Sequence, residues 1–410
     1  MSARTKIFGF GPPNIRGNKR SRPCDPPAGH NGVASNPFTS GRENKRIRRS
    51  KIEDKGSSVQ STPLHNILKP LGVDSFIFHK KLGEGSFGKV FLASDRTTGH
   101  QVAIKMVKKR PLLKYAAVKR AMDEKRVLEL AGGSPFLTAS YATFQTVDYL
   151  CYVMEYLRGG DLFDFLNTRA PLDEDTIRFL TAEIICGLQY LHTMGVIHRD
   201  ISPENIFLDS TGHIKIGDYG LCATDVSAEN KASGCVGAQN YMAPEVFNQD
   251  SYDSSVDWFS LGVLMYKMTT GTMKSVNQDR QTYPEGCSEY LVDIIEKLLR
   301  TNAEKRLEFA TTIRNHPFFA DIDWAKLMAK EVAPPFSMAS APLMDPVFYV
   351  PVQHIISQRE AKKPAIPPEG QKMFWGFSSS SHTWKMLQRQ AGSQVLSPRD
   401  IRVLLVTVSP

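Results

Sequence analysis

The pattern of apolar and polar positions changes near residue 75 of this 410-residue chain. Residues 1–74 are rich in Pro, Gly, Asn, Ser and basic residues and show almost no periodic apolar pattern. Such a segment cannot bury enough surface to offset its ordering entropy, so we expect a disordered basic tail there. From Phe76 the texture changes to alternating apolar strands, which indicates a folded domain.

One hairpin and two helices of the folded part follow from spacing. Apolar runs at 206–208 and 213–216 flank Asp-Ser-Thr-Gly, which predicts a β-hairpin closed by a turn. Residues 115–131 read as a helix. A second, amphipathic helix is predicted by apolar positions at steps of three and four. These positions are Ile177, Leu180, Ile184, Leu188 and Leu191.

The net charge of +9 belongs to the tail. Residues 1–74 contain 14 Lys and Arg against 5 Asp and Glu, which leaves 37 of each sign for the rest. A folded part without net charge gives no reason to expect specific nucleic-acid binding. The basic cluster Lys45 to Lys51 is read either as a nuclear-localisation or anionic-surface patch, or as a merely solvated tail.

The cysteines and the apolar runs indicate the compartment. Six cysteines are scattered without a C-x-x-C pair, so a reduced intracellular protein without zinc is the simplest interpretation. No apolar run has signal-peptide character or could span a bilayer. We expect a cytoplasmic protein, with a nuclear location if the basic cluster directs it there.

Polar residues flank the predicted hairpin. Asp200 and Asn205 precede it and Asp218 follows it, so the hairpin brings three metal- or proton-handling side chains to one end. This arrangement suits phosphoryl transfer, in which positioning and electrostatics do most of the catalysis.

A glycine-rich turn joins the first two predicted strands. Residues 83–90 read Gly-Glu-Gly-Ser-Phe-Gly-Lys-Val, and Val-Ala-Ile-Lys follows at 102–105. Glycines let backbone N–H groups fold over phosphates, although a glycine-rich turn without a nucleotide is the alternative. A strand and not a helix follows, which excludes the dinucleotide-binding version of the motif.

Together these motifs closely resemble the eukaryotic protein kinases. The resemblance rests on His198-Arg199-Asp200 with Asn205, on Asp218-Tyr219-Gly220, on the glycine turn and on the strand lysine. It implies an α+β, bilobal fold with a small β-rich N-lobe (75–155) and a larger, mainly helical C-lobe (159–319).

The resemblance also implies the cofactors ATP and Mg²⁺ and the roles of single residues. Lys105 would hold the phosphates and Glu124 would pair with it, unless Glu124 belongs to a surface charge pair. Asp200 would accept the substrate proton, and Asn205 and Asp218 would hold metal ions. Nucleotide contacts are expected at Leu82, Gly83, Glu84, Gly85, Ser86, Phe87, Gly88, Lys89, Val90, Ala103, Lys105, Met154, Glu155, Leu157 and Asp161. For Asp161 a helix cap is an equal possibility.

Longer stretches, such as Phe76–Gly83 and Glu124–Leu128, look like a protein kinase C catalytic domain of the novel, delta-like type within the AGC group. Its lipid-binding modules have no counterpart here, so we do not carry over lipid regulation. Residues 320–380 are similar to the AGC tail, including an Asp-Pro-Val-Phe motif at 345–348, and 381–410 form an extra segment. Phe374 and Phe377 would fill a small-lobe pocket, with Ser378 as the site of an activating kinase, unless these aromatics cluster incidentally.

Two contacts of the C-lobe follow from the same resemblance. Asp257 normally braces the catalytic loop, and Arg306 normally pairs with Glu245 of the Ala-Pro-Glu motif. A buried pair of this kind fixes geometry more certainly than it adds stability.

Several positions depart from the kinase pattern. Ser202 stands where a lysine is usual, Ala238 where a threonine is usual, and Gly234 where the phosphorylated threonine is usual, so Arg199 lacks its phosphate partner. Tyr219 for phenylalanine is a mild change, and the docking region after Gly271 is short. We expect a monomeric serine/threonine kinase acting on protein substrates; the alternative is a nucleotide-binding pseudokinase scaffold.

Overall fold

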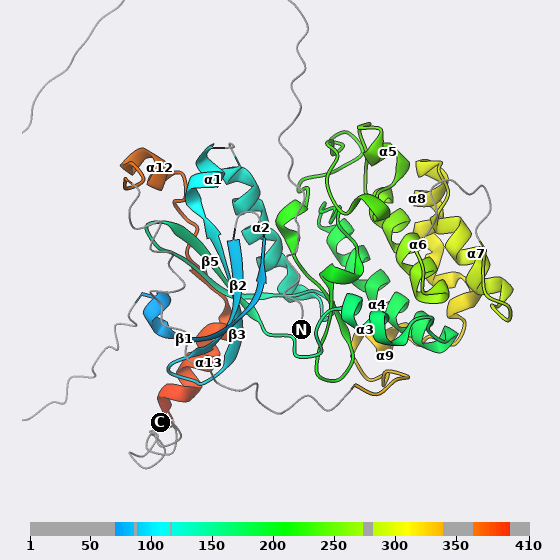
Figure 1. Cartoon of the computed structure of the whole chain (residues 1–410), viewed down its shortest axis with the longest axis horizontal. Helices are drawn as coiled ribbons and strands as arrows, with labels where there is room; N and C mark the ends of the chain where they lie inside the picture. The colour runs from blue at the N-terminus through cyan, green and yellow to red at the C-terminus, as the bar shows by residue number, and fades with distance from the viewer. Residues whose placement is uncertain (1–69, 86–87, 115–116, 274–281, 339–363, 394–410) are drawn as a thin grey trace, which may run out of the picture. The chain divides into compact units, whose positions relative to one another are not determined.

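A computed structural model of the chain describes residues 70–85, 88–114, 117–273, 282–338 and 364–393. Within these ranges the chain forms a small lobe built on an antiparallel sheet and a larger lobe built mainly of helices (Figure 1). The predicted α+β, bilobal fold is therefore confirmed. The tail up to residue 69, with the basic cluster Lys45 to Lys51, lies outside the described residues.

The small-lobe sheet has the strand order β1-β2-β3-β5-β4-β8, and every neighbouring pair is antiparallel. Its strands are β1 (Phe76–Glu84), β2 (Gly88–Asp95), β3 (Gln101–Lys108), β4 (Ser140–Gln145), β5 (Tyr149–Glu155) and β8 (Ser379–Ser380). Along β5, Leu150 and Tyr152 join the main core, whereas Cys151 and Val153 join a second core on the other face. The alternation follows from the two-residue period of a strand.

Two helices join β3 to β4, namely α1 (Lys109–Lys114) and α2 (Val118–Leu130). The helix predicted over 115–131 thus corresponds to α2. Its buried residues include Val127 and Leu128, which pack in the same core as Tyr152 of the sheet.

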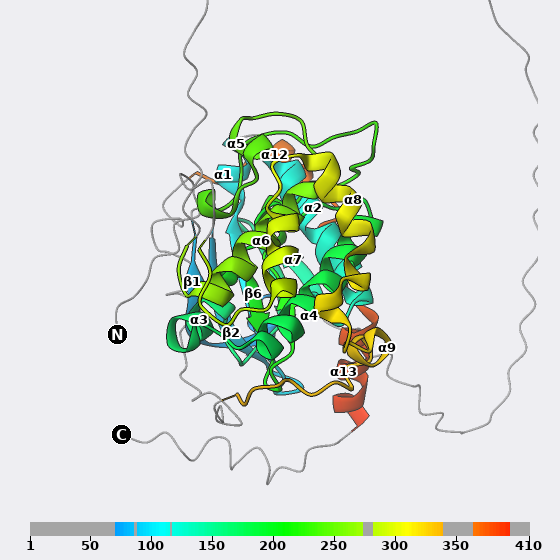
Figure 2. The ribbon, with the colours of Figure 1, turned by 90° about the vertical axis from the view of Figure 1, so that its right-hand side faces the viewer.

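Helices make up most of the large lobe (Figure 2). They are α3 (Leu162–Arg169), α4 (Glu174–Thr193), α5 (Pro244–Phe247), α6 (Ser255–Thr270), α7 (Glu289–Leu298), α8 (Ala303–Thr312) and α9 (Trp324–Met328). Every residue of α6 from Ser255 to Tyr266 is buried, and α4 packs beside it. All five apolar positions predicted for α4 are buried, and Asp173 caps its N-terminus by accepting a hydrogen bond from the Thr176 N–H (2.8 Å).

The predicted hairpin is confirmed as β6 (Ile206–Leu208) and β7 (Ile214–Ile216), with Ile206 opposite Ile216. The Asp209 side chain closes the turn by accepting from the Thr211 N–H (2.8 Å) and the His213 N–H (3.1 Å). The two strands therefore hold the segments before and after them at the same end.

The folded part begins before the predicted boundary at residue 75. Val73–Ser75 form a short 3-10 turn in which Val73 is buried, and Val73 and Leu71 pack on the second core of the small lobe. The sequence signal was weak because a single turn is too short to show a period.

The C-terminal region returns to the small lobe through α12 (Pro368–Lys372), β8 and α13 (His382–Ser393). The Asp-Pro-Val-Phe motif at 345–348 lies outside the described residues, as do residues 274–281 after Gly271. Among the helices of the described ranges, none is long and apolar enough to cross a membrane.

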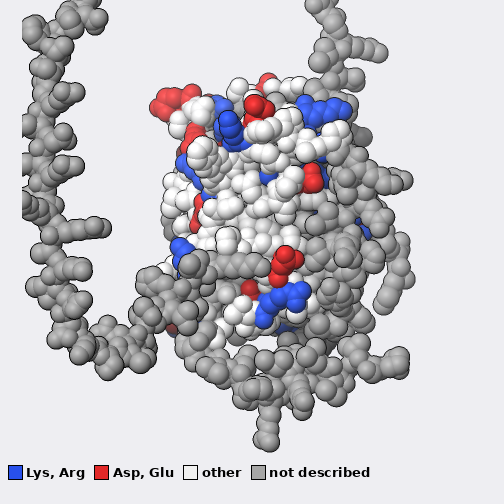
Figure 3. Space-filling view, turned by 90° about the vertical axis from the view of Figure 1, so that its left-hand side faces the viewer, with Lys and Arg blue, Asp and Glu red and all other residues white. Residues whose placement is uncertain are grey.

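Charges of both signs lie around an uncharged centre on the small-lobe face shown in Figure 3. This mixture agrees with the balance of 37 basic and 37 acidic residues after position 74.

The buried turn before β1 predicts a difference between two deletions. Removal of residues 1–69 should leave the free energy of unfolding nearly unchanged, because their composition favours little burial. Removal of 1–74 should lower it by about 1–2 kcal/mol, since Val73 no longer fills the second core. Thermal unfolding of both proteins beside the full chain measures this, and equal melting temperatures for the two deletions would contradict it.

Candidate functional site

An ion cluster joins three separate segments at the base of the small lobe. The Lys105 Nζ of β3 lies 2.5 Å from the Glu124 Oε1 of α2 and 2.9 Å from the Asp218 Oδ1 that follows β7. Burial alone would lower the pKa of Lys105, but the Asp218 and Glu124 carboxylates outweigh it and raise that pKa above its ordinary value. The surface pair considered for Glu124 is excluded, because its side chain is buried and paired with Lys105.

The strand register aligns the glycine turn with this cluster. Gly83 of β1 pairs with Val90 of β2, and Val90 pairs with Lys105 of β3, so the three residues lie side by side across the sheet. A Cβ at Gly88 would lie only 2.2 Å from the Met106 carbonyl oxygen, so the close approach of β2 to β3 requires glycine there.

Residues 86 and 87 of the turn lie outside the described ranges. Of the rest, Gly85 donates its N–H to the Gly88 carbonyl at 2.9 Å. Glu84 pairs with Lys81 (2.7 Å) and Lys89 (3.7 Å) at the surface. The pKa of Glu84 is lowered, first by its hydrogen bond with Lys81.

The predicted catalytic aspartate is held at both carboxylate oxygens. Asp200 Oδ2 accepts from the Asn205 Nδ2 (2.7 Å), and Oδ1 accepts from the Ala238 backbone N–H (2.7 Å). Burial raises the pKa of Asp200, although His198 and these hydrogen bonds oppose the rise. The carboxylate is thus oriented by donors on both sides.

Asp257 braces the catalytic loop from beneath, as predicted. This fully buried carboxylate accepts from the backbone N–H groups of His198 and Arg199, both at 2.8 Å, and lies 2.8 Å from the His192 ring. Burial would raise its pKa, but its interactions with His192 and His198 lower that pKa below its usual value. The brace holds Arg199 at a φ of 67°, a conformation that side-chain-bearing residues seldom adopt.

The second predicted contact of the C-lobe is also present. Arg306, which is fully buried, forms an ion pair with Glu245, and its Nε donates to the Ser255 carbonyl at 2.8 Å. This pair ties α5, which carries Glu245, to α6 and α8.

The Arg199 guanidinium donates to three backbone carbonyls and to the Tyr252 hydroxyl (3.3 Å). It reaches the Leu221 oxygen (2.6 Å), the Cys222 oxygen (3.2 Å) and the Ser233 oxygen (3.2 Å). The arginine that the sequence left without a phosphate partner is therefore bound to the segment between Asp218 and the Ala-Pro-Glu motif.

The substituted positions lie within this assembly. Ser202, two residues after Asp200, is buried. Ala238 donates its backbone N–H to the Asp200 carboxylate. Tyr219 keeps the aromatic packing expected of phenylalanine, with its ring 5.7 Å from that of His198 and its hydroxyl donating to the Ile216 carbonyl (2.8 Å).

The remaining residues predicted to contact the nucleotide differ in their burial and in their contacts. Ala103 lies opposite Met154 in the sheet, and Leu157 is half-buried. Asp161 does cap α3, since it accepts from the Asp164 N–H at 3.0 Å. Leu82 is partly exposed at the end of β1.

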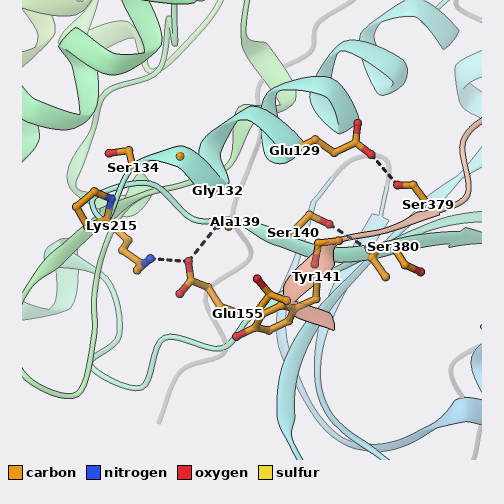
Figure 4. Close-up of a pocket in the computed structure, with 15 residues that line it drawn as sticks. Glu129, Gly132, Ser134, Ala139, Ser140, Tyr141, Glu155, Lys215, Ser379 and Ser380 are labelled. Atoms are coloured by element: carbon orange, nitrogen blue, oxygen red, sulfur yellow. Dashed lines mark hydrogen bonds and ion pairs between the residues drawn. The ribbon is translucent and has the colours of Figure 1, made fainter. Parts of the chain in front are cut away.

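The side chain of Glu155 does not join the ion cluster. It accepts from the Ala139 N–H (3.0 Å) and pairs with Lys215 of β7 (2.8 Å), as Figure 4 shows. Both groups lie at a cleft of about 710 Å³, and neither Lys105, Asp200 nor Asp218 lines it. Sequence analysis missed Lys215, whose only signal was a charge between two isoleucines of a short strand.

The residues present fit a nucleotide with Mg²⁺. The Asn205 amide N–H donates to Asp200, so the amide oxygen is left to bind a cation. The Asp218 carboxylate would be a second ligand. A metal ion bound to phosphates needs only one or two carboxylates from the protein. Within the described ranges, no group of three or more His, Cys, Asp or Glu residues is placed to hold a metal ion by itself. Open space next to Gly83 leaves room for a ligand against the backbone.

The family model for the protein kinase domain matches residues 76–319. The chain therefore belongs to the protein kinase family. The chain is similar to human protein kinase C delta type, with 42% identity over 275 residues that cover 64% of this chain and 41% of that protein. It is also similar to protein kinase C-like 1B of Caenorhabditis elegans, with 41% identity over 283 residues that cover 65% of this chain and 40% of that protein. The RAC serine/threonine-protein kinase of Drosophila melanogaster is 37% identical over 295 residues, which cover 68% of this chain and 48% of that protein. The match thus spans less than half the length of each relative.

The Asp257 brace predicts a stability effect. Asp257→Asn should lower the free energy of unfolding at pH 7 by about 2–4 kcal/mol, because a neutral amide satisfies the buried N–H donors poorly. Since the pKa of Asp257 is lowered, its contribution is fully present at neutral pH and is lost only as the pH falls through that lowered pKa. Denaturant unfolding measures it, with the exposed Asp250→Asn as control; equal stability of the two variants would show that the brace contributes nothing.

Proposed function

We propose that this protein is an ATP- and Mg²⁺-dependent serine/threonine kinase of the protein kinase C type that acts on protein hydroxyl groups. One observation carries the proposal: the sheet, α2 and the segment after β7 converge on the Lys105–Glu124–Asp218 cluster. A structural ion pair alone needs no second carboxylate from the other lobe.

In this proposal the cluster and the glycine turn bind the nucleotide. Glu124 holds the Lys105 ammonium in place, and the charged amine contacts the α- and β-phosphates. The glycine turn, Val90, Ala103 and Met154 enclose the nucleotide from the sheet, and the 154–157 segment contacts the adenine. Asp161 contacts the ribose or a basic residue of the substrate in addition to its cap.

The large lobe supplies the groups that act on the hydroxyl. Asp200, fixed by Asn205 and Ala238, orients the substrate hydroxyl and accepts its proton. Asn205 and Asp218 hold Mg²⁺, which neutralises charge on the phosphates when it is bound. Asp257 keeps the loop that carries Asp200 in place.

Another kinase is proposed to act on Ser378 of the C-terminal tail and to raise a basal activity that does not itself require this phosphate. Phe374 and Phe377 are fully buried in the small lobe, whereas Ser378 is exposed and accessible to modification. We further propose a monomer in the cytoplasm, with entry to the nucleus directed by the basic cluster Lys45 to Lys51. That part of the proposal rests on sequence composition.

A phosphate-transfer assay on generic basic peptides tests the proposal. The wild-type protein should transfer phosphate, and Asp200→Asn should lose at least about a thousandfold in turnover because the substrate hydroxyl has no base. Mg²⁺ with ATP should raise the melting temperature of both proteins by mass action. Lys105→Met should reduce that shift.

Two results would contradict the proposal that the protein is a kinase. Equal signal from wild type and Asp200→Asn would assign the transfer to a contaminant. A melting shift without any transfer would indicate a nucleotide-binding scaffold.

The two substituted positions beside Asp200 predict coupled kinetics. Ser202→Lys with Ala238→Thr should raise kcat more than the two single changes together. A lysine adds charge for the moving phosphoryl group, and a threonine links that lysine to Asp200. The single variants should gain little, since an untethered ammonium has no fixed geometry. A double-mutant cycle of kcat on one peptide measures the coupling, and additive effects would refute it.

A further inference from the structure

The tail reaches the small lobe through polar contacts around two buried aromatic residues. Lys109 Nζ lies 2.7 Å from the Gln371 Oε1 and 5.1 Å from the centre of the Phe374 ring. Gln145 donates to the Phe374 carbonyl at 3.1 Å, and Thr143 donates to the Phe377 carbonyl at 2.5 Å. Phe374 and Phe377 are both fully buried.

Phe377 is connected to the ion cluster through one tyrosine. Its ring meets the Tyr152 ring edge-on, with the centroids 5.1 Å apart. The Tyr152 hydroxyl donates to the Ala121 carbonyl of α2 at 2.9 Å. Glu124 follows one turn later on the same helix, so displacement of Phe377 would loosen the helix that positions Glu124 against Lys105.

The chain beyond Ser378 is attached at the edge of the sheet. Ser379 and Ser380 pair with Thr143 and Ala142 as the short strand β8. The Ser379 hydroxyl donates to Glu129 of α2 at 2.6 Å (Figure 4). Directly after β8, the Ser381 N–H donates to the Tyr141 carbonyl at 2.8 Å.

Helix α13 then places Trp384 in the second core of the small lobe. Trp384 is 3% exposed, and its ring centre lies 5.7 Å from that of Tyr141 and 6.1 Å from that of Phe76. The Ser381 hydroxyl starts the helix by accepting from the Trp384 N–H at 3.1 Å. In contrast, Trp375, between the two buried phenylalanines, is 85% exposed.

We propose that residues 379–393 form a built-in clamp that keeps Phe374 and Phe377 docked without phosphorylation of Ser378, and that Trp384 is its positioning residue. This proposal depends on the proposed kinase function only where it predicts a change in turnover. Six residues separate Phe377 from Trp384, so once one of them is bound the other rebinds at a high effective concentration. Docking is then a property of the chain itself.

The experiment compares Trp384→Ala with the matched control Trp375→Ala, each with and without Ser378→Ala, in the full chain produced without other kinases. Trp384→Ala should lower kcat about tenfold or more, because truncation of a buried Trp shifts the docking equilibrium strongly. Trp375→Ala and Ser378→Ala should leave kcat within about twofold of wild type, since both side chains are exposed. Trp384→Phe should restore most of the activity.

Hydrogen exchange provides a readout that does not depend on transfer. In Trp384→Ala, amides of residues 374–380 and of α2 should exchange faster, while those of α6 keep wild-type protection. Unchanged exchange in the tail and α2 would overturn the clamp, as would loss of turnover in Ser378→Ala alone. If the wild type transfers no phosphate, the kinase proposal fails and exchange still decides on the clamp.

Discussion

The contact between the Lys105 ammonium and the Glu124 carboxylate is the interaction on which the functional part of this protein depends. Both charges are largely removed from solvent, so neither is stable there without the other. Because Lys105 belongs to the sheet, Glu124 to α2 and Asp218 to the segment after β7, the cluster exists only when the two lobes and the helix are in place. The ion cluster therefore forms only together with the contact between the lobes.

A second set of constraints acts in the large lobe, where backbone geometry is less favourable. Arg199 and Asp218 both have positive φ values, 67° and 59°. Such conformations persist only when the surroundings over-determine them. Asp257 does this for Arg199 by accepting hydrogen bonds from two backbone N–H groups, and its position in the buried part of α6 (Ser255–Tyr266) makes the brace rigid. The strain lies next to Asp200 and Asn205, where precise positioning of polar atoms has the greatest effect.

The substitutions beside Asp200 remove side-chain groups but leave the backbone support of the aspartate intact. Ala238 still donates its N–H to Asp200, so this contact does not depend on the identity of the side chain at 238. What Ser202 cannot provide is a positive charge. The structure therefore retains the orientation of Asp200 without a positive side chain at position 202. On the other side of α2, Tyr152 contacts both the Ala121 carbonyl and the Phe377 ring.

Elements with local signals could be predicted from the order of residues alone. The hairpin, the buried face of α4 and the ordered motifs around Lys105, Asp200 and Asp218 were predictable, because each is encoded by spacing or by residues only a few positions apart. The pairing of Arg306 with Glu245 and the brace by Asp257 followed from family resemblance. The folded arrangement was needed to establish that Glu155 pairs with Lys215, that Val73 is buried, and that Trp384 rather than Trp375 packs in the small lobe. These outcomes depend on which surfaces remain open after the sheet has formed, and a linear pattern of apolar residues does not contain that information.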